Sequence, residues 1–258
     1  MEMASPTTIR EGSPEWQARV DLAAAHRLAV MHGLNEGIFN HLTLRVPGKS
    51  DRYLQIPFGT HWSEVTASCF MEVGYDGTLL AGAGEIEDTC YAIHAPIHRI
   101  LERAGAVLHT HMPFASALTR LEDPRILPLG QTELSMELHT AYDGDYGGLV
   151  FDSSEGERYA RMLGNEKTIL MMANHGVLVF GRRVAEAFDR LYYLERAAQV
   201  QLHAMWTGRP LRLLSQEVIE TTQREFRNYR QKGGKPNCEH HFGALKRILD
   251  RREADYRN

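Results

Sequence analysis

The chain has 258 residues, of which 43% are hydrophobic and 24% charged, with a formal net charge of −4. This ordinary globular composition carries no basic cluster that would favour nucleic acid, and no apolar run approaches the roughly 18 residues that span a membrane. Three scattered cysteines argue against a disulfide framework and lead us to expect a cytoplasmic protein.

The first third of the chain predicts one helix followed by short strands. We expect 1–17 to form a flexible leader, and the apolar residues that follow, at helical spacing up to Gly33, to form a helix. Alternating polar and apolar residues predict strands in 37–48 and 52–59. Asp76–Gly77, between two further apolar stretches, predicts the turn of a hairpin.

The middle of the chain predicts a helix in 87–105, because its isoleucines fall on one helical face and Gly105 would suit the C-cap. A buried strand, "AVLHTHM" at 106–112, should follow it. The apolar runs after this point predict a short strand and loop in 126–134 and further strand segments in 148–152 and 168–181, the last interrupted by Asn174–His175–Gly176.

The last part of the chain predicts a long amphipathic helix, 184–208, and a helical tail, 215–258. Strands and helices mix without strict alternation. The sequence therefore favours one layered α/β domain with a mixed sheet over 18–214, flanked by the leader and the tail.

Two histidines separated by one residue end the strand predicted at 106–112. Because residues i and i+2 of a strand share a face, His109 and His111 would present their imidazoles side by side. Neutral imidazole is a common metal ligand, and His175, in a turn before another apolar strand, could supply a third. The ordinary alternatives stay open: a half-buried, hydrogen-bonded histidine pair and a histidine that only serves a turn.

The segments "GAVLHTHMP", "MMANHGVLVFG" and "VAEAFDRLYYLERAAQVQ" together resemble the class II aldolase/adducin family, over roughly Ala18 to Ala204. "IPFGTHWSEVTAS" and "DTCYAIHAPIHRI" are more similar to its adducin-like branch. The resemblance implies a three-layer α/β/α fold with a mixed central sheet, commonly assembled as a homotetramer. It also implies a divalent metal ion, usually zinc, bound by His109, His111 and His175.

The resemblance further implies a metal-dependent lyase that cleaves a C–C bond of a small hydroxy or oxo compound, or decarboxylates it. Both reactions leave a carbanion next to a carbonyl, and a Lewis acid on that oxygen stabilises the enolate. Two alternatives stay open. One is an adducin-like binding or scaffold protein without catalysis, and the other is a sugar-phosphate epimerase.

The chain departs from the aldolases of the family at Cys90, which aligns with the glutamate that serves as their acid/base. A thiolate is a good zinc ligand, so Cys90 is a possible fourth ligand; a small buried residue is the ordinary alternative. Glu133 and Glu87 are the candidates for proton transfer. The ordinary alternatives are that Glu133 is a surface residue and that Glu87 only stabilises a helix N-terminus. The candidates for hydrogen bonds to the substrate are Asn40, Thr60 and Thr89.

Overall fold

The computed structural model describes residues 10–230 and 236–258. The strands are β1 (His41–Arg45), β2 (Arg52–Gln55), β3 (Met71–Gly74), β4 (Leu79–Ala81), β5 (Ala106–Thr110), β6 (Thr140–Asp143), β7 (Ile169–Met172) and β8 (Val177–Gly181). The helices are α1 (Pro14–Met31), α2 (Asp88–Ile100), α3 (Pro113–Leu118), α4 (Gln131–Glu137), α5 (Ser153–Leu163), α6 (Val184–Trp206), α7 (Gln216–Arg230) and α8 (Asn237–Arg252), with 3-10 turns η1 (Trp62–Glu64) and η2 (Ala254–Arg257).

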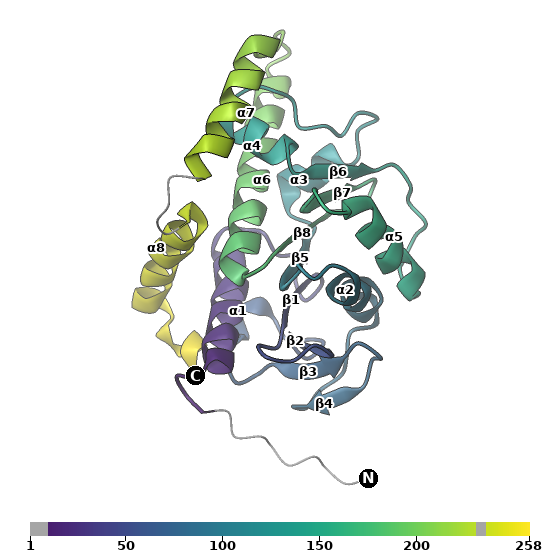
Figure 1. Ribbon diagram of the computed structural model, residues 1–258, viewed down its shortest axis with the longest axis vertical. Coiled ribbons are helices and arrows are strands. Elements are labelled where there is room, and N and C mark those ends of the chain that lie inside the picture. The colour runs from purple at the N-terminus through teal and green to yellow at the C-terminus, as the bar shows by residue number, and fades with distance from the viewer. Residues whose placement is uncertain (1–9, 231–235) are drawn as a thin grey trace.

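One mixed sheet forms the centre of the molecule, in the strand order β4-β3-β2-β1-β5-β8-β7-β6. The pair β6–β7 is parallel and the other neighbouring pairs are antiparallel. Helices α1 and α6 pack against one face, and α2 and α5 against the other (Figure 1). The expected three-layer α/β/α fold is therefore confirmed.

The alternation of side chains along the strands divides the core between the two faces. On β5, Ala106 and Leu108 belong to the larger core cluster under α1 and α6, whereas Val107 belongs to the cluster under α2 and α5. His109 lies on the same face as Val107, two residues further along. In the antiparallel register, His41 of β1 pairs directly with His109, so the sheet presents two neighbouring histidines beneath α2.

Two predicted boundaries differ from the structure. Helix α1 begins at Pro14, inside the expected leader, because the Ser13 side chain caps the Trp16 N–H and proline suits the first helical position; residues 1–9 lie outside the described chain. Helix α2 ends at Ile100 rather than at Gly105. A Cβ at Gly105 would lie 2.2 Å from the Arg182 carbonyl oxygen, so this glycine serves close packing and not a cap.

Two of the predicted strands are wrong. Residues 131–137 form the helix α4. Before it, the backbone N–H of Ile126 donates a hydrogen bond to the Tyr142 hydroxyl and not to a neighbouring strand. Residues 148–152 pair with no strand of the described chain; Leu149 and Phe151 there are 78% and 69% exposed. An apolar run becomes a buried strand only where a partner surface exists, and here the sheet ends at β6. The sequence did not predict β6 as a strand.

The described part of the tail is helical, as expected, and its end packs on the domain. Leu249 and Tyr256 are fully buried in the larger core cluster, and Arg27 of α1 forms ion pairs with Glu253 at 3.1 Å and Asp255 at 2.8 Å. No helix in the described residues is both long enough and apolar enough to cross a membrane.

Candidate metal centre and its surroundings

Three imidazoles meet where β5 ends and where the chain turns from β7 into β8. The ring centroids of His109, His111 and His175 form a nearly equilateral triangle with sides of 5.0, 4.9 and 4.9 Å. One ring nitrogen from each lies within 4.8 Å of the other two. The structure thus brings together the three histidines singled out from the sequence, and we call them the histidine triad.

Hydrogen bonds orient two rings of the histidine triad. The Nδ1 atom of His109 lies 2.9 Å from the Val177 carbonyl oxygen, and that of His111 lies 2.5 Å from a Glu36 carboxylate oxygen. Both partners only accept, so each Nδ1 carries a proton and each Nε2 presents a lone pair. The Nε2 of His111 is buried and has no hydrogen-bond partner. Sequence interpretation missed Glu36, which lies 75 residues from His111 and carries no motif.

Burial keeps the rings of the histidine triad neutral. It lowers the pKa of His109 well below its usual range and that of His175 to about 4, and the neighbouring imidazoles act in the same direction. The pKa of His111 is also lowered by burial, although Glu36 opposes the shift. Neutral imidazole is the form that binds a metal, so at pH 7 the triad needs no deprotonation to act as a ligand set.

Gly176 permits the close approach of the two segments that carry the triad. A Cβ at this position would lie 2.6 Å from Cδ2 of His111 and 2.6 Å from the Thr110 carbonyl oxygen. We expect Gly176→Ala to displace the His111 ring, to cost about 1–3 kcal/mol of unfolding free energy from overpacking, and to weaken metal binding. Urea unfolding without metal and calorimetric zinc titration measure the two effects.

The matched control for this substitution is Gly144→Ala. A Cβ there has no atom within 4 Å, so unfolding free energy and zinc affinity should both stay close to wild type. If Gly176→Ala binds zinc as tightly as Gly144→Ala, the close contact at Gly176 does not position His111.

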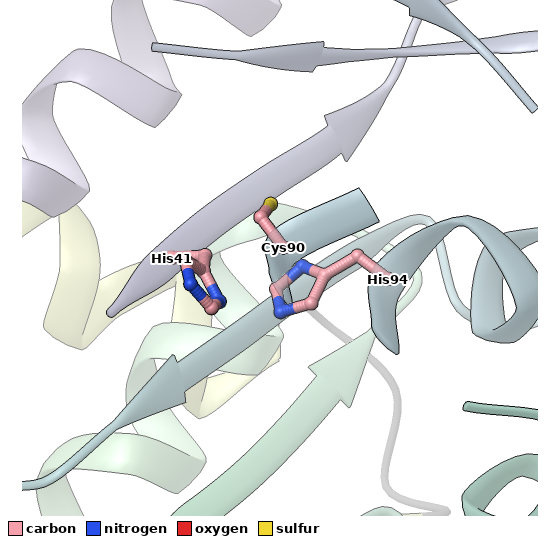
Figure 2. Close-up of side chains that lie close together, drawn as sticks. All are labelled: His41, Cys90 and His94. Atoms are coloured by element: carbon pink, nitrogen blue, oxygen red, sulfur yellow. The ribbon is translucent and has the colours of Figure 1, made fainter. Parts of the chain in front are cut away.

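A second group of potential ligands lies beside the histidine triad. Cys90 and His94, four residues apart on α2, share one face of the helix. A ligand atom of each lies within 4.8 Å of the other and of a ring nitrogen of His41, and Figure 2 shows the three side chains together. The rings of His41 and His109 are 5.4 Å apart, so the two groups are neighbours.

The sequence left Cys90 open between a fourth ligand of the triad and a small buried residue. The structure places its fully buried side chain with His41 and His94, which the interpretation did not select as site residues. Two signals could have found them: the alternation along β1, which turns His41 to one face with Thr43, and the i, i+4 spacing of Cys90 and His94.

Glu87 and Thr89 hold the start of α2 against His41. The Glu87 carboxylate caps the helix by accepting from the backbone N–H groups of Thr89 and Cys90, and it lies 2.7 Å from Nε2 of His41. Burial alone would raise the pKa of Glu87, but the hydrogen bonds from His41 and Thr89 outweigh it and lower this pKa to about 2. Glu87 is therefore a carboxylate throughout the neutral range.

The remaining sequence candidates occupy different places. Asn40 accepts a hydrogen bond from the His111 backbone N–H at 3.0 Å, and its own Nδ2 is buried without a partner. A pocket of about 20 Å³, lined in part by Asn40, His41 and Glu87, has room for about one water molecule. Thr60 follows β2, in the turn before η1. Glu133 is buried in the first turn of α4, which packs against α6 and α7.

The fold and the order of the histidine segments match one family. Residues 20–202 match the model of the class II aldolase and adducin N-terminal domain. An aldolase II superfamily protein from Pseudomonas syringae is 36% identical and superposes with a TM-score of 0.86, over 95% of this chain and 97% of that one. The chain belongs to the class II aldolase and adducin family.

Relatives of this class II aldolase/adducin chain carry names from both branches. An adducin-related protein of Schizosaccharomyces pombe is 30% identical, over 99% of this chain and 81% of that protein. L-fuculose 1-phosphate aldolase from Glaciozyma antarctica superposes with a TM-score of 0.82 over 99% of this chain and 97% of that one, and at 22% identity it shows the shared fold alone. Membership of the family therefore leaves the choice between catalysis and binding to the site itself.

Proposed function

We propose that this chain is a metal-dependent, aldolase-type lyase that cleaves or decarboxylates a small hydroxy or oxo compound. The observation that carries the proposal is the histidine triad, with its three ring nitrogens within 4.8 Å. The residues fit a divalent cation such as zinc, because neutral imidazoles are ligands that it prefers and the buried Nε2 of His111 has no other partner. Three protein ligands leave a coordination position for a substrate.

The cation, when bound, would act as a Lewis acid that stabilises negative charge on a substrate carbonyl oxygen. The chain's own residues would orient that substrate. The free Nδ2 of Asn40, beside His111, can donate to a substrate oxygen. The hydroxyl groups of Thr89 and Thr60 are the further candidates for such hydrogen bonds, and Thr89 lies 3.2 Å from His41.

Of the two proton-transfer candidates, the geometry favours Glu87. The Glu87 carboxylate pairs with His41, whose ring lies next to that of His109. Glu133 instead lies on α4, which packs against α6 and α7. With a pKa of about 2, Glu87 is ionised at neutral pH. It would therefore accept a proton before it could supply one, and its low basicity would make it a weak base.

A binding protein without catalysis is the second candidate, and Cys90 is the observation that favours it. The thiol stands where the resemblance places the acid/base glutamate of the aldolases. Burial raises the pKa of Cys90 well above its usual value, and the nearby Glu87 carboxylate adds to this effect. A protonated, fully buried thiol cannot replace a carboxylate as a base.

The proposal includes a homotetramer, which the family resemblance implies. The loop between β6 and α5 exposes Leu149 and Phe151, at 78% and 69%. A contact between subunits would cover exposed apolar side chains of this kind.

Exchange of the hydrogen next to a carbonyl with deuterium from D2O tests the proposed chemistry. Dihydroxyacetone, its phosphate, glycolaldehyde and pyruvate serve as probes, and NMR follows the exchange. We expect zinc-loaded protein to accelerate exchange of at least one probe, and chelation to abolish the acceleration until zinc is restored. Zinc solution without protein gives the baseline. Protein that binds zinc stoichiometrically at the triad but exchanges none of these probes would favour the binding protein.

A further inference from the structure

A chain of hydrogen bonds determines which nitrogen of His94 lacks a proton. Nδ1 of His98 donates to the Ala104 carbonyl oxygen at 2.8 Å, and burial lowers the pKa of His98 to about 3, so its Nε2 must accept. The Thr43 hydroxyl, 2.8 Å from that Nε2, donates to it and accepts from Nδ1 of His94 at 2.7 Å; its other acceptor, the Val107 carbonyl, is 3.4 Å away. His94 Nε2 is left with a lone pair, buried and without a partner.

His41, whose ring centroid lies 5.3 Å from that of His94, presents a second lone pair. Its Nε2 lies 2.7 Å from the Glu87 carboxylate, which only accepts, so Nε2 carries the proton. Nδ1 of His41 is then an acceptor, and it too is buried without a partner. Buried polar atoms without partners cost free energy and are rare in native proteins. The single proton of the Cys90 thiol can satisfy only one of the two nitrogens.

We propose that His41, Cys90 and His94 form a second metal site, separate from the histidine triad, for a divalent cation of the zinc class. One cation would satisfy both lone pairs at once. Two imidazole nitrogens and one thiolate are donors that favour zinc or cobalt over magnesium or calcium. The site stands on its own residues, whichever reaction or binding the triad serves.

The dimensions fit such a cation. Ligand bonds of roughly 2.0–2.3 Å in a tetrahedral site separate the donor atoms by roughly 3.4–3.7 Å. One ring nitrogen of His41, one of His94 and the Cys90 sulfur already lie within 4.8 Å of one another, with the rings of His41 and His94 on either side of a common space and Cys90 next to them (Figure 2). A closure of about 1 Å for the widest pair, which side-chain rotation can provide, completes the geometry.

The surroundings also suit a bound cation. Glu87 behind His41 and Thr43 behind His94 hold the outer ring nitrogens, as hydrogen-bond partners of metal ligands commonly do. Cys90 would bind as a thiolate and release its proton to solvent, so the thiolate and Glu87 together offset the two positive charges. The neighbouring pocket of about 20 Å³, which Cys90 and Glu87 help to line, has room for one water as the fourth ligand.

Cobalt titration tests the second site, because a thiolate bound to Co²⁺ gives a charge-transfer absorption in the near ultraviolet that an all-histidine site lacks. Wild-type protein, freed of metal, is titrated with Co²⁺ under reducing conditions. We expect two cobalt ions per chain and a thiolate band. His175→Ala should lose one ion and keep the band, whereas His94→Ala and Cys90→Ser should each lose one ion together with the band.

Two results would overturn the proposal. Wild-type protein without a thiolate band would show that Cys90 binds no metal. One ion per chain, with a band that His175→Ala removes and His94→Ala retains, would show that Cys90 completes the triad site instead. The wild-type titration and His175→Ala decide between these outcomes even if His94→Ala, at a fully buried position, fails to fold. This test does not depend on catalysis at the triad, so it holds even if the triad binds cobalt without catalysing any reaction.

Discussion

Alanine at His111 should lower the affinity of the histidine triad for zinc by more than about a hundredfold, because it removes a metal ligand outright. Loss of a hydrogen bond that only supports a ligand typically costs about 10- to 100-fold. Glu36→Gln provides that milder case: its side chain still accepts from Nδ1 of His111 but no longer carries the negative charge found 2.5 Å away. Zinc affinity should be highest for the wild type, lower for Glu36→Gln and lowest for His111→Ala.

Zinc affinity is measured by competition with a chelator in a Cys90→Ser background, so that the triad alone is counted. His203→Ala, which removes an exposed histidine of α6, is the control and should bind like wild type. Any zinc-dependent turnover should fall in parallel with zinc occupancy. If His111→Ala retains wild-type affinity, the three converging rings are only hydrogen-bonded core and turn residues.

Acid should destabilise the metal-free protein well before its carboxylates titrate. Burial holds the pKa of His26 at about 4 and that of His98 at about 3, and it lowers the pKa values of His94 and His109 well below the usual range. Below about pH 6.5 the unfolded chain therefore binds more protons than the folded one, and stability falls as pH falls. His26 and His98 each remove about 1.4 kcal/mol per pH unit below about pH 6.5, or about 2 kcal/mol by pH 5, and His94 and His109 act in the same direction.

The loss from His26 and His98 alone is a large part of the stability of an ordinary domain, so the urea midpoint should drop steeply between pH 7 and pH 5. His26→Gln provides the internal comparison, because glutamine cannot titrate and the variant should lose one histidine's share of the slope. The measurement is made with a chelator present to exclude linked metal binding. A midpoint that stays constant over this range would show that these rings become protonated inside the fold at little cost.

Local patterns in the sequence determined the part of the site that depends on neighbours along the chain. His109, in β5, and His111, one residue past its end, have rings 5.0 Å apart, as alternation along a strand predicts. Asp76–Gly77 forms the predicted hairpin turn because glycine adopts φ 84° there without strain. The family resemblance then supplied the layer arrangement and the association of His175 with that pair. These conclusions needed no knowledge of which surfaces meet.

The tertiary structure alone decided which distant residues complete and surround the site. His41 faces His109 because of the register between β1 and β5, and Cys90 lies beside His41 because α2 docks across that pair. Glu36 reaches His111 from a loop before β1. Such contacts depend on strand register and helix docking, which bring together segments from many positions of the chain. The same reason explains 148–152, whose apolar residues predicted a strand but met no partner strand in the described chain.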